Sequence, residues 1–108
     1  MTYASLKRDK DIRIHVRGHA GYNPGNDIVC AAISTITAMT GDFFLDQDRL
    51  YHRKNIKELV YKPGTFSLIL KEDPEHKAEQ DAALHMLVIG LCSIAEQYPQ
   101  NLKVEGTL

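Results

Sequence analysis

Two residues of this sequence have the side chains of a nucleophile and its base, and only a short loop separates them. His19 follows Gly18 at the end of a predicted strand, and Cys30 lies in the first turn of a predicted helix. Because the loop is short, bringing the two side chains together costs little chain entropy. A Cys–His pair can attack a carbonyl carbon through sulfur and form a thioester. This arrangement predicts nucleophilic catalysis at Cys30, with His19 as its base.

The position of Cys30 in the chain favours a reactive sulfur. The N-terminus of a helix stabilises negative charge through its free amides and its dipole, so a thiolate is stabilised there. An imidazolium at His19 would stabilise that thiolate further, as an ion pair. The amides of the same helical turn are also expected to donate to the oxyanion of a tetrahedral intermediate.

Asp27 has two alternative roles in this arrangement. As the predicted N-cap of the helix, it would accept the backbone amide of Cys30, and its charge would then oppose the thiolate. Turned towards His19, it would instead orient the imidazole and stabilise the charged ring, as the third member of a catalytic triad does. The residues alone leave both roles open.

Further residues near the pair predict a peptide groove with a lid. Ser34 lies four positions after Cys30, on the same helix face. Thr37 and Gly41 continue this small polar face, which suits an extended peptide. Gly21 and Gly25 make the loop before the helix mobile enough to act as a flexible lid.

Each of these residues also has a purely structural explanation. A cysteine early in a helix is often a small buried apolar residue. A histidine among glycines is often a turn residue on the surface. Asp27 needs only its capping role to explain it, and the hydroxyl of Ser34 can bond to the preceding helical turn.

The elements that must position these residues alternate between strands and helices. Thr2–Arg8 and Ile12–Arg17 predict one hairpin, with Ile12, Ile14 and Val16 facing the core. Glu58–Lys62 and Thr65–Lys71 predict a second hairpin around a Pro63–Gly64 turn. A short last strand is expected over Asn101–Glu105. The order β-β-α-β-β-α-β predicts the α+β class, as a two-layer α/β sandwich in a single domain over residues 1–108.

The first predicted helix runs from Asp27 to about Thr40, with Gly41 as its C-cap. Asp46–Lys57 is expected to be an irregular connection. The core face of this helix is expected to hold Val29, Ala32, Ile36, Met39 and Phe43.

The second predicted helix starts at Asp73–Pro74 and stops at Pro99. Cys92 is expected in the core. Met86 and Ile89 lie off the main apolar face, and such excess apolar surface favours a homodimer. The main face is expected to hold Leu84, Leu87, Val88, Leu91, Ile94 and Tyr98.

Composition and motifs exclude several classes of protein. The net charge of −1 over 108 residues gives no broad electrostatic hold on nucleic acid, so no direct nucleic-acid partner is expected. The longest apolar run, Met86–Cys92, is too short to cross a bilayer, and the start lacks a signal peptide; we therefore expect a cytoplasmic protein without a membrane partner. Two cysteines without a CxxC pair, and no glycine-rich phosphate loop, predict no metal site and no cofactor.

Two motifs resemble those of the ribosomal-processing cysteine proteases, the Prp family: Gly18-His19-Ala20-Gly21, and the segment 27–34, which reads Asp-Ile-Val-Cys-Ala-Ala-Ile-Ser. The resemblance extends over nearly the whole chain. It implies a cysteine endopeptidase with catalytic His19 and Cys30 and with Asp27 and Ser34 in supporting roles. Because the family motif retains a carboxylate at position 27, we expect Asp27 to orient His19.

The resemblance also implies a substrate and an assembly. The substrate is the precursor of a ribosomal protein, the twenty-seventh of the large subunit, which loses a short N-terminal extension. The resemblance implies a small α/β sandwich as the fold and a homodimer as the assembly. Two alternatives remain: a prophage-type relative that cleaves capsid or scaffold proteins, and a non-enzymatic ribosome-associated assembly factor on the same fold.

Overall fold

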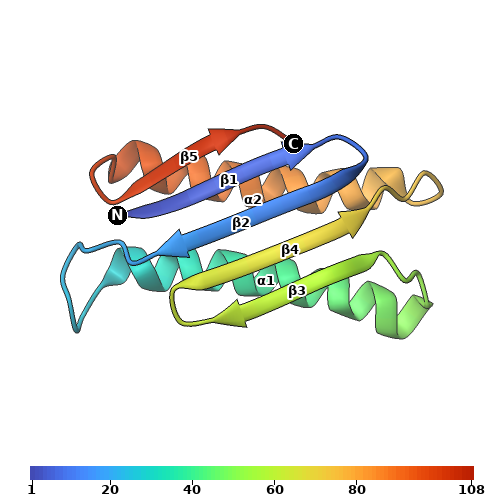
Figure 1. Cartoon of the computed structure of the whole chain (residues 1–108), viewed down its shortest axis with the longest axis horizontal. Coiled ribbons are helices and arrows are strands. Elements are labelled where there is room, and N and C mark those ends of the chain that lie inside the picture. Colours follow the sequence, from blue (N-terminus) through green and yellow to red (C-terminus); the bar gives the residue numbers. More distant parts are fainter.

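The computed structural model describes all 108 residues and contains five strands and two helices in the predicted order (Figure 1). The sheet forms one layer and both helices lie on the same side of it, so the prediction of an α+β two-layer sandwich is confirmed. The elements are β1 (Thr2–Arg8), β2 (Asp11–Gly18), α1 (Ile28–Tyr51), β3 (Ile56–Lys62), β4 (Thr65–Lys71), α2 (Lys77–Gln97) and β5 (Leu102–Gly106).

The sheet has the strand order β3-β4-β2-β1-β5. Both predicted hairpins form, β1 with β2 and β3 with β4, and β2 also pairs antiparallel with β4. The last strand, β5, pairs in parallel with β1, so that Thr2 lies opposite Leu102. This topology places the C-terminal end of β2 and the β3–β4 turn at the same end of the sheet, beside the start of α1 (Figure 1).

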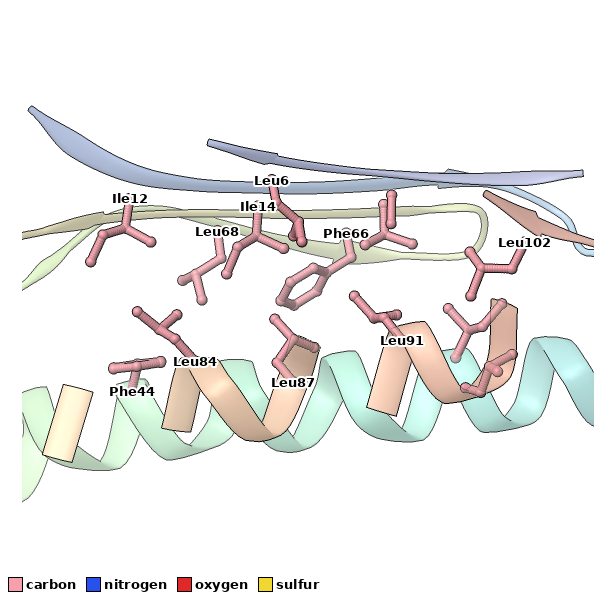
Figure 2. Packing of buried hydrophobic residues seen from close by; sticks show 14 of the residues in the cluster. Leu6, Ile12, Ile14, Phe44, Phe66, Leu68, Leu84, Leu87, Leu91 and Leu102 are labelled. Atoms are coloured by element: carbon pink, nitrogen blue, oxygen red, sulfur yellow. The ribbon is translucent and has the colours of Figure 1, made fainter. Parts of the chain in front are cut away.

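The core fills the space between the sheet and the two helices. Ile12, Ile14 and Val16 of β2 are buried on the helix side, as their alternation predicts. Figure 2 shows Leu84, Leu87 and Leu91 of α2 beneath the side chains of the sheet, and these residues are fully buried. The predicted apolar face of α2 is therefore confirmed at its centre.

The first helix is longer than the sequence indicates, because Gly41 lies inside it. Helix α1 continues to Tyr51, so the expected C-cap at Gly41 is wrong, and of the irregular connection expected over Asp46–Lys57 only residues 52–55 are irregular. A Cβ at Gly41 would lie 3.2 Å from Leu59 Cδ1 and 3.3 Å from Phe66 Cε1. The glycine thus allows the helix to approach the sheet closely rather than ending it.

The buried face of α1 also differs from the prediction. Val29 is buried, but Met39 is 66% exposed, and Ile36 packs against α2, where it leaves no room for a Cβ at Gly90. The helix contacts the sheet with one face and α2 with another. The sequence analysis assigned all the apolar residues to a single face and so did not distinguish the two. Its buried residues are Val29, Ile33, Thr37, Thr40, Gly41 and Phe44.

Two predictions for the second helix are wrong. Helix α2 begins at Lys77, because the backbone amide of His76 donates to the Asp73 carboxylate and closes a separate turn before it. Cys92 is exposed rather than in the core. It follows Leu91 by one residue, a rotation of about 100° around the helix axis, which carries its side chain out of the buried face.

Helix α1 is long and apolar enough to cross a bilayer by length and composition alone, a feature that the sequence analysis missed. In the structure it lies along the sheet, and Val29, Ile33 and Phe44 belong to the common core. A core helix of a two-layer sandwich meets the same criteria, so the measure does not indicate a membrane span.

Candidate active site

His19 and Cys30 line the same cavity, which has a volume of about 430 Å³. The cavity lies between the start of α1 and the β3–β4 hairpin. His19 enters it from the end of β2, and Cys30 from the first turn of α1. The turn residue Gly64 and the strand residue Tyr61 lie on the hairpin side. The fold thus brings together the two residues that the sequence singles out, at one open-sided hollow.

The sulfur of Cys30 accepts a hydrogen bond from the loop that precedes the helix. The backbone N–H of Ala20 donates to Cys30 Sγ at 3.1 Å. Ala20 is buried, and its carbonyl accepts a hydrogen bond from the side-chain amide of Asn101 at 3.0 Å. Both the N–H and the carbonyl of Ala20 are therefore hydrogen-bonded. A hydrogen bond to sulfur stabilises the thiolate more than the thiol. Cys30 is half-buried, as a nucleophile facing a cavity must be.

Asp27 is the N-cap of α1, and it also fastens the loop. Its Oδ1 accepts the amides of Val29 at 3.0 Å and Cys30 at 2.9 Å. Its Oδ2 accepts the amides of Tyr22 at 2.9 Å and Asn23 at 3.4 Å. The bond from the Cys30 amide, followed by the other three, lowers the pKa of the Asp27 carboxyl below its ordinary value.

These contacts correct two expectations. Asp27 makes no hydrogen bond to His19, so the expectation that it orients the imidazole is wrong: four backbone amides already occupy the carboxylate. The amides of Val29 and Cys30 in turn donate to Asp27. These two amides are therefore occupied, and the expectation that they donate to an oxyanion is wrong for them.

The His19 imidazole lies against the β3–β4 turn and makes no hydrogen bond. A Cβ at Gly64 would lie 3.1 Å from its Nε2, which places the ring directly over that turn. The carbonyl of His19 accepts the N-terminal ammonium of Met1 at 2.7 Å. The N-terminus thus holds the backbone of His19, whereas its side chain is exposed and lies against the glycine of the turn.

The predicted polar face of α1 reaches the cavity in part. Ser34 and Thr37 line it, whereas Gly41 lies deeper, under Phe66. The backbone carbonyl of Ser34 accepts the hydroxyl of Tyr61 at 3.0 Å, and the Tyr61 ring packs edge-on against Phe66. Tyr61 therefore bridges the edge of the sheet and α1 at the cavity.

Sequence reasoning missed Ala20, Tyr61 and Gly64 as parts of this site. The Pro63–Gly64 turn was expected, but nothing in a turn sequence reveals that it lies beside His19. That proximity comes from the pairing of β2 with β4, in which Arg17 lies opposite Thr65. Placing Gly64 beside His19 would have required the register of the sheet, which the sequence analysis did not predict.

The predicted lid does not cover the cavity in this structure. None of the residues 21–26 lines it, and the amides of Tyr22 and Asn23 are bound to Asp27. The Tyr22 ring packs edge-on against Tyr98, with ring centroids 5.3 Å apart. Gly21 and Gly25 both have positive φ angles, 69° and 89°. The role of this loop as a lid stays a prediction.

No group of three or more His, Cys, Asp or Glu side chains comes together as a metal site. The described residues supply a thiol and an imidazole that line one cavity, with one backbone N–H directed at the sulfur.

The fold is similar to that of several solved structures. The essential ribosomal processing protease Prp from S. aureus, in complex with a covalently linked product peptide, matches with a TM-score of 0.69 and 18% identity, over 96% of this chain and 95% of that one. The same protease with a substrate peptide matches with a TM-score of 0.64, at the same identity and coverage. SMU.848 from Streptococcus mutans matches with a TM-score of 0.66 and 21% identity, over 97% of this chain and 92% of that one.

At these identities the solved structures establish the fold alone. No curated protein sequence matches the chain significantly. The family model described as cysteine protease Prp matches residues 1–103, almost the whole sequence, which contradicts the non-enzymatic alternative. The chain belongs to the Prp family of cysteine proteases.

Proposed function

We propose that this protease removes a short N-terminal extension from a large-subunit ribosomal protein, the twenty-seventh, by a Cys–His thioester mechanism. The observation that carries the proposal is the shared cavity of His19 and Cys30, with the Ala20 N–H directed at the sulfur. The similar protease from S. aureus is described as a ribosomal processing protease and binds a substrate peptide. Its likeness in fold supports a peptide substrate for this chain.

In this mechanism the thiolate of Cys30 attacks the carbonyl carbon of the scissile peptide bond. His19, protonated by the thiol, gives that proton to the leaving amine as the C–N bond breaks. The N-terminal fragment stays on sulfur as a thioester. Water then attacks the thioester with His19 as base, releasing a carboxylate and restoring the thiol.

Asp27 and Ser34 act in this mechanism as supporting residues. Asp27 fixes the backbone of Cys30 through the helix cap and holds the loop that carries the Ala20 N–H. Ser34 lies one turn further along the cavity, where the backbone of an extended peptide would pass. The loop of Gly21 and Gly25 would close over the peptide and exclude water from the thioester step.

The assembly that we propose is a homodimer in the cytoplasm. Met39 of α1 and Met86 and Ile89 of α2 are 66%, 69% and 51% exposed on the helical layer. Large apolar side chains exposed on a small protein favour contact with a second copy, whose matching surface would cover them. Sedimentation of the purified protein would test this, and a monomer at micromolar concentration would contradict it.

The test of the substrate uses two sets of peptides. One set spans the N-terminal extension of the ribosomal protein, and the other spans candidate cleavage sites of capsid and scaffold proteins. We expect cleavage within the first set, with the new termini identified by mass spectrometry. Cleavage confined to the second set would instead support the prophage-type alternative.

The nucleophile is tested with Cys30→Ala, with Cys92→Ser as a matched control because Cys92 is the other cysteine and is exposed. Loss of both the base-assisted and covalent contributions predicts a fall in cleavage of more than about a hundredfold for Cys30→Ala. Cys92→Ser should cleave like the wild type. Equal activity of Cys30→Ala and wild type would reject the mechanism.

A further inference from the structure

The imidazole of His19 occupies space that a side chain at position 64 would need. The nearest ring atoms, Nε2 and Cε1, lie 3.1 Å and 3.3 Å from the point where a Cβ at Gly64 would stand. Such distances are tighter than nine in ten real Cβ contacts, so the ring would have to move by a few tenths of an ångström. Gly64 lies in the turn between β3 and β4, with a positive φ of 77°.

The same turn is bound to the backbone next to His19. The amide of Gly18 donates to the carbonyl of Gly64 at 2.9 Å, and Arg17 pairs with Thr65 in the sheet. The turn therefore cannot drift away from His19 as a free loop could. The distance between the imidazole and the turn is set by the register of β2 and β4.

No hydrogen bond orients this ring. The Asp27 carboxylate, at the end of the same loop, is occupied by four backbone amides. In a triad, a carboxylate bonded to the imidazole performs this task. Here the orientation of the imidazole depends on its contact with the turn at Gly64.

We infer that Gly64 is a positioning residue for His19: the bare backbone of the turn is the surface on which the imidazole rests, facing the cavity that it shares with Cys30. The inference rests on the proposed function, because the position of the ring matters only if His19 pairs with Cys30. A base displaced from its partner loses rate steeply with distance, by up to about a hundredfold for 1 Å.

The experiment compares Gly64→Ala with Gly64→Asn in a Cys92→Ser background, which leaves Cys30 as the only thiol. Both variants add the same Cβ, but asparagine tolerates a left-handed backbone, so it keeps the test valid where alanine folds poorly. Gly25→Ala is the control for backbone strain: its φ is 89°, and no atom lies within 4 Å of the added Cβ. Its melting temperature shows the effect of strain without the contact.

The readouts are the rate of Cys30 alkylation by iodoacetamide against pH, and kcat and KM for a cleaved peptide. We expect both Gly64 variants to be alkylated on the order of tenfold more slowly near pH 6.5, with equal rates near pH 9.5, which lies above the ordinary range for cysteine thiols. kcat should fall by a similar factor with little change in KM. In a His19→Ala background, Gly64→Ala should cause no further loss.

The possible results separate the two claims. A slower reaction in His19→Ala but not in either Gly64 variant would overturn the positioning role and leave the Cys–His pair standing. Equal rates in all variants near pH 6.5 would overturn both. A loss from Gly64→Ala that persists in the His19→Ala background would show that the substitution acts through something other than the imidazole, and would also overturn the inference.

Discussion

Asp27 holds Cys30 by its backbone: the carboxylate Oδ1 accepts the Cys30 amide at 2.9 Å. The other oxygen of the same carboxylate accepts the amide of Tyr22 at 2.9 Å. One side chain therefore fixes both the helix that carries the sulfur and the loop that carries its N–H donor, Ala20.

Replacing Asp27 by Asn separates these two tasks. The amide oxygen of Asn can still cap α1. Its NH₂ group, however, is a donor and would face the donor N–H of Tyr22, so the loop contact is lost. We expect turnover to fall about tenfold with a small change in melting temperature, because Ala20 loses its fixed position. Wild-type turnover in Asp27→Asn would contradict the role of the loop contact, and Asp27→Ala, which removes both contacts, is the matched comparison.

The depressed pKa of Asp27 predicts a particular dependence of stability on pH. Backbone amides, first that of Cys30, stabilise the ionised carboxylate in the folded state and lower its pKa. This contribution to stability is fully present above the unfolded pKa, about 3.9, and is lost as the pH falls through the lower folded value. The difference in melting temperature between wild type and Asp27→Ala, which removes both contacts of the carboxylate, should therefore shrink below about pH 4. A difference that stays constant down to about pH 2 would contradict this account.

His19→Ala should slow both cleavage and alkylation of Cys30. Loss of general-base catalysis predicts a fall in cleavage of about a hundredfold or more. In a Cys92→Ser background, alkylation near pH 6 should also be slower, on the order of tenfold, because no imidazolium stabilises the thiolate. His85→Ala, which removes an exposed histidine of α2, is a control for the loss of any histidine. Equal alkylation rates in wild type and His19→Ala would show that the two side chains do not pair.

The loop from Gly21 to Asn26 should become more protected when a peptide binds. In the free protein its side chains are exposed, while the amides of Tyr22, Asn23 and Asn26 are hydrogen-bonded. Hydrogen exchange should show partial protection at these three amides and fast exchange at Gly21 and Gly25. A non-cleaved peptide bound to Cys30→Ala should slow exchange throughout the loop. Unchanged exchange on binding would remove the lid from the proposed mechanism.

Local patterns in the sequence predicted most of the fold because they reflect local causes. The alternation of Ile12, Ile14 and Val16 follows directly from the two faces of a strand. Gly41 was misread because a helix-ending glycine and a glycine at a close helix–sheet contact look alike in sequence. Cys92 was misplaced because one residue of rotation decides between core and solvent.

The candidate site was predictable only where it depends on residues close in sequence. The loop between His19 and Cys30 made their shared cavity foreseeable. The contact of His19 with Gly64 was not, because it depends on the register of strands distant in sequence. The role of Asp27 required knowing which amides lie within reach of its two oxygens, and these belong to a loop whose path has no regular pattern.

The parallel pairing of β1 with β5 has a consequence for the order in which the site is assembled during folding. The N–H donor at Ala20 is secured by Asn101, and the amide of Thr2 donates to the carbonyl of the same Asn101 at 2.9 Å. The residues around Ala20 are therefore supported by residues that follow α2 in the chain. Contacts between such distant positions form late in folding. A chain in which β5 has not yet paired with β1 thus carries Cys30 without this support for its hydrogen-bond donor.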